Sequence, residues 1–355
     1  MKRRSFLHSA LAGGVATALD VDVSGAAPAG RRPYRLLPCE EAFTIPEILA
    51  AAREYAHNIP SWASGPIVGP AVPLLLDLGE GRLRGMDAAG IDMQILSLGS
   101  PGVQNFDASN AVSLARLAND RLAEAIKAHP TRYAGLATFA PQDPAAAVKE
   151  LQRCKSELEL NGALVNSHTN GEYLDDPKYW PILEALEALE IPLYIHPRDA
   201  APGVAGAAVP GFTVGWGFAV ETGTHALRLI GSGVFDRFPK LTIVLGHMGE
   251  GLPFFLERID NRYKFEAAMF PPQVKLQLQP GEYFRRNFLV TTSGMNVGPP
   301  LAATIGTIGI DRVLFAVDYP FEDQPATVAA WDAIPLSVED KRKICETNVR
   351  RTFGV

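Results

Sequence analysis

Residues 241–250 have the sequence LTIVLGHMGE, in which an almost continuous apolar run is followed at once by a glycine, a histidine and a carboxylate. An unbroken run of apolar and β-branched residues is typical of a strand buried on both faces, as in a parallel sheet. Similar runs at residues 192–197 and 312–318 also carry polar residues at their ends. Buried strands with polar ends are therefore the feature from which the fold is predicted.

Eight such runs are spaced along the chain. They cover residues 35–40, 92–98, 133–140, 162–167, 192–197, 241–247, 287–293 and 312–318. Stretches rich in Ala, Leu and Glu with helical spacing lie between them, as at residues 110–129 and 220–238. Eight strands alternating with helices over about 325 residues predict an α/β fold, the (β/α)8 TIM barrel. A doubly wound open sheet is disfavoured, because no Gly-x-Gly-x-x-Gly or phosphate-binding loop follows the first strand.

The composition excludes several classes of protein. The chain has 355 residues, of which 47% are hydrophobic and 20% charged, so it has ample material for a core. Its formal net charge of −6 provides no basic surplus for a nucleic-acid partner. The three cysteines, Cys39, Cys154 and Cys345, form an odd and widely spaced set. This set excludes a disulfide scaffold and a CxxC zinc site.

The N-terminus has the features of an export signal. Lys2, Arg3 and Arg4 precede a short apolar stretch, and Ala27-Pro28-Ala29 supplies the small residues of a cleavage site. We predict a twin-arginine signal over residues 1–30 and a single barrel domain over residues 31–355. The alternative is a frayed N-terminal helix. The apolar stretch is too short to span a membrane, which needs about 20 residues. A soluble, periplasmic mature protein with no membrane segment is therefore expected.

Four predicted strands end in side chains that suit a metal ion: Glu40, His196, His247 and Asp318. Functional groups of a TIM barrel collect at the carboxyl ends of its strands, so these four are expected at one rim. Each alone has an ordinary alternative, since a histidine can be structural, Asp318 can cap a helix and Glu40 can pair with an arginine. Burying all four without partners would cost several kcal/mol each. Together they predict a site for one divalent cation.

Two further residues are candidates for substrate binding. His168 follows the fourth strand and could face the substrate, or could be structural. Arg258 lies about three helical turns beyond His247. It could clamp a substrate carboxylate in a bidentate manner, or form a solvated ion pair with Glu257 or Asp260.

Four strings of the sequence resemble one enzyme family. They are IPLYIHPR (191–198), LGHMGEGLPFFLERIDNR (245–262), FRRNFLVTTSG (284–294) and RVLFAVDYPFED (312–323), with EEAF (40–43) and GALVNS (162–167) in support. The family is the metal-dependent aromatic acid decarboxylases of the amidohydrolase superfamily, which includes γ-resorcylate and 2,3-dihydroxybenzoate decarboxylases. The resemblance extends from about Leu36 to the C-terminus and implies a barrel of the amidohydrolase type.

The resemblance implies a role for each candidate. Glu40, His196 and Asp318 would hold one divalent metal ion, Asp318 would also donate a proton to the ring, and His247 would assist it. Arg258 and Phe321 would bind an aromatic carboxylate, the small-molecule partner of the protein. The resemblance also implies a homo-oligomer, either a dimer or a tetramer.

One departure from the superfamily bears on the metal. Hydrolytic members carry His-x-His on the first strand, where this chain has Glu40-Glu41-Ala42. The alanine cannot bind a metal, and the loss of a nitrogen ligand favours Mg²⁺ or Mn²⁺ over Zn²⁺. The fourth strand ends in Asn166-Ser167 without the lysine of binuclear hydrolases. A mononuclear site with Mn²⁺, Mg²⁺ or Zn²⁺ is expected.

The sequence thus leads to one main hypothesis for function. The protein is expected to be a carbon–carbon lyase that decarboxylates a hydroxylated aromatic acid without oxidation, reversibly and with release of CO₂. Asp318 would protonate the ring carbon, because direct loss of CO₂ would leave a carbanion in the ring plane. An alternative on the same scaffold is a metal-dependent hydrolase of a lactone, ester or amide. A third possibility is a metal-stabilised binding protein without catalysis.

Overall fold

Eight parallel strands form a single sheet in sequence order in the computed structural model, which describes residues 32–54, 69–207, 209–270 and 272–355. The predicted export signal and residues 55–68 lie outside this description. The strands are β1 (Glu41–Phe43), β2 (Gln94–Leu98), β3 (Tyr133–Thr138), β4 (Gly162–Asn166), β5 (Leu193–His196), β6 (Ile243–Leu245), β7 (Phe288–Thr291) and β8 (Val313–Leu314).

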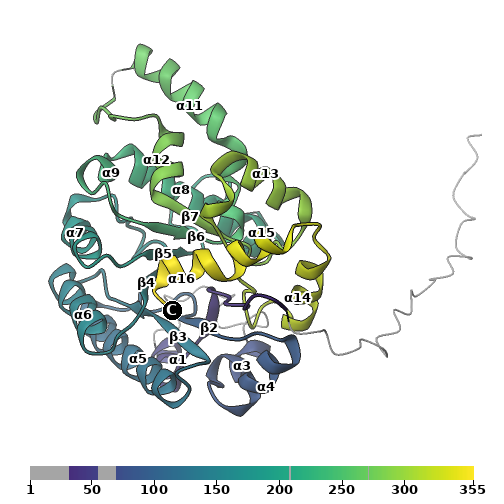
Figure 1. Cartoon of the computed structure of the whole chain (residues 1–355). Coiled ribbons are helices and arrows are strands. Elements are labelled where there is room, and N and C mark those ends of the chain that lie inside the picture. Colours follow the sequence, from purple (N-terminus) through teal and green to yellow (C-terminus); the bar gives the residue numbers. More distant parts are fainter. Residues whose placement is uncertain (1–31, 55–68, 208, 271) are drawn as a thin grey trace, which may run out of the picture. The chain divides into compact units, whose positions relative to one another are not determined.

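Helices follow the strands and cover the outside of the sheet (Figure 1). They are α1 (Pro46–Glu54), α3 (Val72–Leu76), α4 (Glu80–Ala89), α5 (Ala108–Ala128), α6 (Pro144–Ser156), α7 (Trp180–Ala188), α8 (Phe218–Gly231), α9 (Val234–Arg237), α10 (His247–Glu250), α11 (Leu252–Met269), α12 (Pro280–Asn287), α13 (Gly298–Ile308), α14 (Gln324–Ala333), α15 (Val338–Arg342) and α16 (Asn348–Phe353). Among the described residues, no helix has the length and apolar character required to cross a bilayer.

The two ends of the sheet are joined by backbone hydrogen bonds. The N–H of Cys39 donates to the carbonyl of Phe315 at 3.2 Å, and that of Ala42 donates to Tyr319 at 2.7 Å. The unit that contains the sheet spans Tyr34–Val355. The predicted (β/α)8 TIM barrel is therefore confirmed.

The first and last strands differ from their predicted bounds. β1 begins at Glu41, directly after the predicted run 35–40, because that run contains Pro38, which has no N–H to donate. The carbonyls of Leu36 and Pro38 still accept hydrogen bonds from the chain near β2. β8 contains only Val313 and Leu314, so the backbone that leads to Asp318 lies outside the regular ladder.

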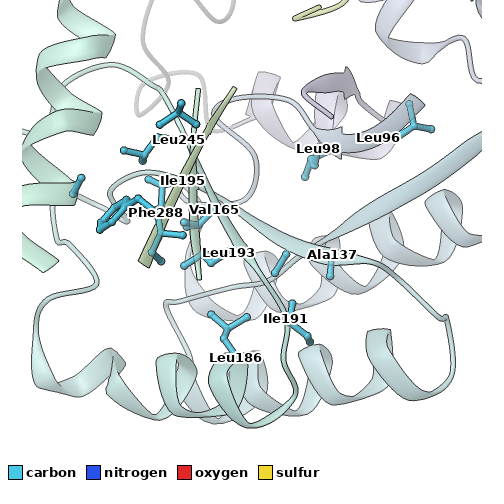
Figure 2. Packing of buried hydrophobic residues seen from close by; sticks show 14 of the residues in the cluster. Leu96, Leu98, Ala137, Val165, Leu186, Ile191, Leu193, Ile195, Leu245 and Phe288 are labelled. Carbon is cyan, nitrogen blue, oxygen red and sulfur yellow. The ribbon is translucent and has the colours of Figure 1, made fainter. Parts of the chain in front are cut away.

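Apolar residues pack in two layers. One cluster fills the space between the strands and the helices, and Figure 2 shows part of it, including Leu96 of β2, Ile195 of β5 and Leu186 of α7. A second cluster has alternate residues of the strands, such as Val244 of β6, and fills the barrel interior. Both layers are fully enclosed, which makes the barrel a rigid support for the side chains at its rim.

The C-terminal helix α16 closes one end of the barrel. Val349 and Phe353 belong to the same cluster as the interior strand residues, and α16 lies across the strands in Figure 1. The segment just before α16 also bonds to both edges of the sheet. The carbonyl of Cys345 accepts from Leu37 N–H at 3.2 Å, and that of Ile344 accepts from Phe315 N–H at 3.1 Å.

Candidate active site

Four side chains from distant parts of the chain meet at the carboxyl ends of the strands. Glu40 precedes β1, His196 ends β5, His247 begins α10 after β6, and Asp318 follows β8. The Glu40 Oε1 atom lies 3.6 Å from His196 Nε2 and 3.8 Å from His247 Nε2. His247 Nε2 is 3.5 Å from Asp318 Oδ2. The structure thus brings together the four residues that the strand ends singled out.

Glu40 is fully buried and is held by one of its two oxygens. Its Oε2 accepts from the hydroxyls of Tyr194 and Thr291, the latter at 2.9 Å. Its Oε1 has no hydrogen-bond partner among the described residues. Burial acts to raise the pKa of Glu40, but His247 and then His196 outweigh it, and the net pKa is lowered. The result is a buried carboxylate with a free oxygen that faces two imidazoles.

The ring of His196 is oriented by the backbone. Its Nδ1 lies 2.7 Å from the carbonyl of Pro197, so Nδ1 carries the proton and donates. In the neutral ring, Nε2 then presents its lone pair toward Glu40. A histidine whose far nitrogen donates to a carbonyl is the usual arrangement of a metal ligand.

His247 is paired with a carboxylate that the sequence arguments did not single out. Its Nδ1 lies 2.9 Å from Glu250 Oε1, and its backbone N–H donates to Ser293 Oγ at 3.0 Å. Burial lowers the pKa of His247, but Glu250 and Glu40 outweigh it and raise the pKa well above the ordinary value. The only sequence signal for Glu250 is its position three residues after the histidine. The pair forms a proton-holding dyad that faces Asp318.

The backbone at this rim is strained at Asp318 and along the turn that contains His247, Met248 and Glu250. Asp318 has φ 79°, and His247 has φ 49°, both in the left-handed region that costs a non-glycine residue about 1–2 kcal/mol. Gly246 lies beside the site, and a Cβ atom there would stand 2.9 Å from Glu40 Oε1. Only glycine lets the chain pass this close to the carboxylate. The strain fixes the directions of the two polar side chains.

The structure excludes the alternative roles of Asp318 as a helix cap and of Glu40 as the partner of an arginine. Asp323, not Asp318, caps the following helix α14 through a bond from Ala326 N–H at 2.8 Å. Glu40 pairs with histidines and has no arginine among its ion-pair partners in the described residues. Burial raises the pKa of Asp318, and Glu40 adds to the rise against the hydrogen bond from His247.

The donor set fits a divalent cation. Ligand atoms of Glu40, His247 and Asp318 lie within 4.8 Å of one another, and His196 faces the same Glu40 oxygen. That oxygen is buried, charged and without a hydrogen bond, which a bound cation would satisfy. Ala42, at the position of the second ligand in hydrolytic members, is buried and offers no donor atom.

The three predicted substrate contacts lie in different settings. Arg258 lies on α11 and is exposed, and Phe321 is 44% exposed three residues beyond Asp318. His168 is buried, with Nδ1 accepting from Gly171 N–H and Nε2 donating to the carbonyl of Asp199, both at 3.0 Å. Both of its nitrogens are therefore occupied by backbone groups. A substrate contact by any of the three stays a prediction.

A second buried polar cluster contains the residues of a Ser-His-Glu triad, but its hydrogen bonds donate in the opposite direction to those of a catalytic triad. His225 Nε2 accepts from Leu174 N–H at 3.2 Å, so its Nδ1 carries the proton and donates to Ser167 Oγ at 3.1 Å. The Ser167 hydroxyl in turn donates to Glu221 Oε1 at 2.9 Å. A nucleophilic serine must give its proton to the histidine. The cluster is a structural network and supplies no nucleophile.

This network predicts an acid-dependent loss of stability. Burial, then His168 and Arg228, lower the pKa of His225 from 6.5 to about 3. Between these two pH values, His225 binds more protons in the unfolded chain than in the folded protein. The contribution of the neutral His225 to stability is therefore complete above pH 6.5 and is lost as the pH falls toward 3. Between pH 7 and 5, His225 should remove about 2 kcal/mol from the free energy of unfolding. In urea titrations at both pH values, a His225→Gln variant should show a smaller drop than the wild type. If the free energy of unfolding fell equally in the two proteins between pH 7 and 5, His225 would not be the source of the pH dependence.

Comparison with known proteins identifies the family. The model of the amidohydrolase family matches residues 77–355. Gamma-resorcylate decarboxylase of Polaromonas sp. (strain JS666) is 42% identical over 293 residues, which cover 79% of this chain and 88% of that protein.

Two solved structures share the fold over almost their whole length. 5-Carboxyvanillate decarboxylase LigW from Sphingomonas paucimobilis has a TM-score of 0.87 and 42% identity, covering 91% of this chain and 99% of that one. Dihydroxybenzoic acid decarboxylase from Polaromonas sp. JS666, with bound manganese and the inhibitor 2-nitroresorcinol, has a TM-score of 0.78 and 38% identity, covering 90% and 97%. The chain therefore belongs to the amidohydrolase family, within its group of aromatic acid decarboxylases.

Proposed function

We propose that the protein is a metal-dependent carboxy-lyase that removes CO₂, reversibly and without oxidation, from a hydroxylated aromatic carboxylic acid. The observation that carries the proposal is the pairing of Asp318 with His247 beside the free oxygen of Glu40. A carboxyl with a raised pKa, a histidine that can share its proton and a cation site lie within one cluster. The three relatives described above are named as decarboxylases of hydroxylated aromatic acids, which agrees with this chemistry.

The site would hold one divalent metal ion through Glu40, His196 and Asp318. When bound, the ion would neutralise the substrate carboxylate and polarise the neighbouring phenolic oxygen. We infer Mn²⁺ or Mg²⁺ in preference to Zn²⁺, because two of the three ligands are carboxylates and Ala42 removes a nitrogen ligand. The manganese in the Polaromonas relative supports this choice.

The residues of this chain transfer one proton to the substrate in each turnover. Asp318, protonated when the substrate is bound, gives its proton to the ring carbon that bears the carboxylate. The bond between that carbon and the carboxylate then breaks, its electron pair returns to the ring, and CO₂ leaves. His247 hydrogen-bonds to Asp318 and relays a proton back to it, and Glu250 keeps the imidazole oriented and charged. One proton is consumed for each CO₂ released.

Arg258, Phe321 and His168 complete the proposed substrate site. The guanidinium of Arg258 would hold an outer substrate oxygen, and the ring of Phe321 would pack on the aromatic ring. His168 can contribute only its ring face, since backbone groups occupy both nitrogens. An Arg258→Ala variant should raise KM more than it lowers kcat, and an unchanged KM would exclude the clamp.

The two imidazoles should be separable by metal binding. His196 presents a lone pair to the site, whereas the raised pKa of His247 keeps that ring protonated before a metal binds. We therefore expect His196→Ala to weaken Mn²⁺ binding by at least ~100-fold and His247→Asn to weaken it by less than ~10-fold, while both lose activity. Isothermal titration with Mn²⁺ measures both constants. The reverse order would assign His247 as the ligand and His196 as its assistant.

A direct assay distinguishes the two enzyme classes. Protein stripped with a chelator and reloaded with Mn²⁺, Mg²⁺ or Zn²⁺ should release CO₂ from at least one acid in a panel of ortho-hydroxybenzoic acids. Product carboxylation in excess bicarbonate would establish reversibility. A folded, metal-loaded protein that releases no CO₂ but opens lactones or esters would be the alternative hydrolase.

We propose that the protein is a homo-oligomer, a dimer or a tetramer. Large apolar side chains are exposed along α11, which projects beyond the barrel in Figure 1. On and just after this helix the exposed set comprises Phe254, Phe255, Phe265, Met269 and Phe270. Exposed patches of this kind typically mark interfaces. Light scattering after gel filtration should give a multiple of 38.2 kDa, and a monomeric wild type would exclude this assembly.

We also propose export through the twin-arginine route to the periplasm. The support is the sequence Lys2-Arg3-Arg4 ahead of an apolar stretch. Fractionation of cells that express the full chain should recover the protein in the periplasm. Replacing Arg3 and Arg4 with Lys should retain it in the cytoplasm, and an unchanged distribution would exclude the route.

A further inference from the structure

We propose that Glu41 is a positioning residue that sets the direction of Asp318, an inference that rests on the role of Asp318 in the proposed function. Glu41 is the first residue of β1 and follows Glu40 directly. Neighbouring side chains on a strand point to opposite faces. The Glu41 carboxyl group accordingly accepts from the backbone on either side of Asp318, and among the described residues it forms no ion pair with His196 or His247.

The bonds of Glu41 bracket Asp318. Its Oε1 accepts from the backbone N–H of Val317 at 3.0 Å, and its Oε2 accepts from that of Tyr319 at 3.4 Å. One carboxylate therefore holds the residue before Asp318 and the residue after it. Two acceptor oxygens in a fixed fork are required for this, which an amide or a hydroxyl cannot supply.

This segment needs such support because the sheet does not provide it. β8 ends at Leu314, so residues 317–319 have no regular ladder partner. Asp318 has φ 79°, a conformation that a non-glycine residue keeps only when its surroundings impose it. Other backbone bonds nearby run from Ala42 N–H to the carbonyl of Tyr319, and from the N–H groups of Phe321 and Glu322 to the carbonyl of Asp318. Glu41 thus takes the place of missing strand pairing on both sides of the strained residue.

Glu41 and Tyr319 are themselves positioned by contacts with two further polar residues, Gln94 and Arg82. Gln94 Nε2 donates to Glu41 Oε2 at 3.4 Å and to Gln324 Oε1 at 3.2 Å. Arg82 on α4 is buried, donates to the carbonyl of Ala42 and lies 4.6 Å over the ring of Tyr319. Burying a carboxyl group in this dry layer is costly unless its oxygens accept hydrogen bonds. The network runs from the helix layer to the backbone of Asp318.

The test compares Glu41→Gln with a matched variant at a residue of α16 that bonds to the backbone near the start of β8. Glutamine has one acceptor oxygen, so one of the two flanking N–H groups would face an NH₂ donor. Outer partners of metal ligands typically contribute 10–100-fold to metal affinity or activity. We therefore expect Glu41→Gln to lower Mn²⁺ affinity and kcat each by ~10–100-fold with KM within ~3-fold. Calorimetry gives the first quantity and CO₂ release the other two.

Asn348→Ala is the matched control. Asn348 is buried and donates to the carbonyls of Ile310 and Val313 near the start of β8. Its loss should lower Tm as much as Glu41→Gln does, but leave Mn²⁺ affinity and kcat of the folded protein unchanged. Gln94→Leu, which removes the hydrogen bonds to Glu41 and Gln324 but leaves Glu41 in place, should lower Mn²⁺ affinity and kcat in the same direction as Glu41→Gln and by a smaller factor.

The outcomes separate this inference from the proposed function. If Glu41→Gln behaves like Asn348→Ala, with reduced Tm but wild-type Mn²⁺ affinity and kcat, Glu41 is structural and the inference is overturned. If the wild type binds Mn²⁺ but releases no CO₂, the proposed function fails. A weaker Mn²⁺ affinity in Glu41→Gln would then still support the positioning role.

Discussion

An Asp318→Asn variant is expected to lose ~10³-fold or more of the wild-type kcat for CO₂ release. Asparagine has the shape of aspartate but cannot carry and return the proton that the ring carbon must receive. The loss should persist at saturating Mn²⁺, because a bound metal cannot replace the proton donor. Measuring kcat at several Mn²⁺ concentrations separates the loss of the proton from the loss of a ligand.

The matched control for this variant is Asp323→Asn, five residues along the same loop. Asp323 caps α14 by accepting from Ala326 N–H, a function that asparagine also performs. Its kcat should be that of the wild type. If Asp318→Asn retained more than about a tenth of the wild-type kcat at saturating metal, the role of proton donor would pass to another group.

Loss of the metal should be equally severe. Chelator-stripped protein is expected to release no measurable CO₂ and to recover fully with Mn²⁺. Glu40→Gln should remain inactive under the same reloading, since its amide cannot supply the charged free oxygen that Glu40 presents. Binding of a ligand at 100 times its Kd stabilises the folded state by about 2.7 kcal/mol. Mn²⁺ should accordingly raise the Tm of the wild type and not that of Glu40→Gln.

Glu150→Gln provides the control for this second prediction. Glu150 on α6 pairs with Arg153 and accepts from Asn119, and among the described residues it forms no ion pair with His196 or His247. Its variant should lose some stability but keep the full rise in Tm with Mn²⁺. A wild-type rise in Glu40→Gln would mean that the ion binds without Glu40 and that the ligand set is wrong.

The sequence predicted the barrel because its buried strands are almost continuous apolar runs. A run such as 241–245 is a local feature, which can be recognised without knowing which segments pack against it. The bounds of the first and last strands were less accurate, because Pro38 and the strained Asp318 displace pairing in ways that depend on the neighbouring segments. The clustering of Glu40, His196, His247 and Asp318 was predictable from strand ends alone, since parallel strands share one rim.

The supporting contacts were not predictable in this way. Tyr194 and Thr291 hold Glu40 from inside the barrel, and they are 97 residues apart in sequence. The bonds of Glu41 to Val317 and Tyr319 span 276 residues or more. Such partners depend on the register of strands and on the height of each side chain in the barrel. No local pattern in the sequence carries that information.

The attachment of the C-terminal segment to both edges of the sheet has a consequence for the synthesis of the protein. Ile344 and Cys345 bridge the first and last strands, and Val349 and Phe353 fill the end of the interior. A nascent chain that lacks residues 344–353 can join the two ends of the sheet only through direct bonds such as those of Cys39 and Ala42, and the end of its interior is not yet filled. Packing of the barrel interior is therefore complete only once residues 344–353 have been made.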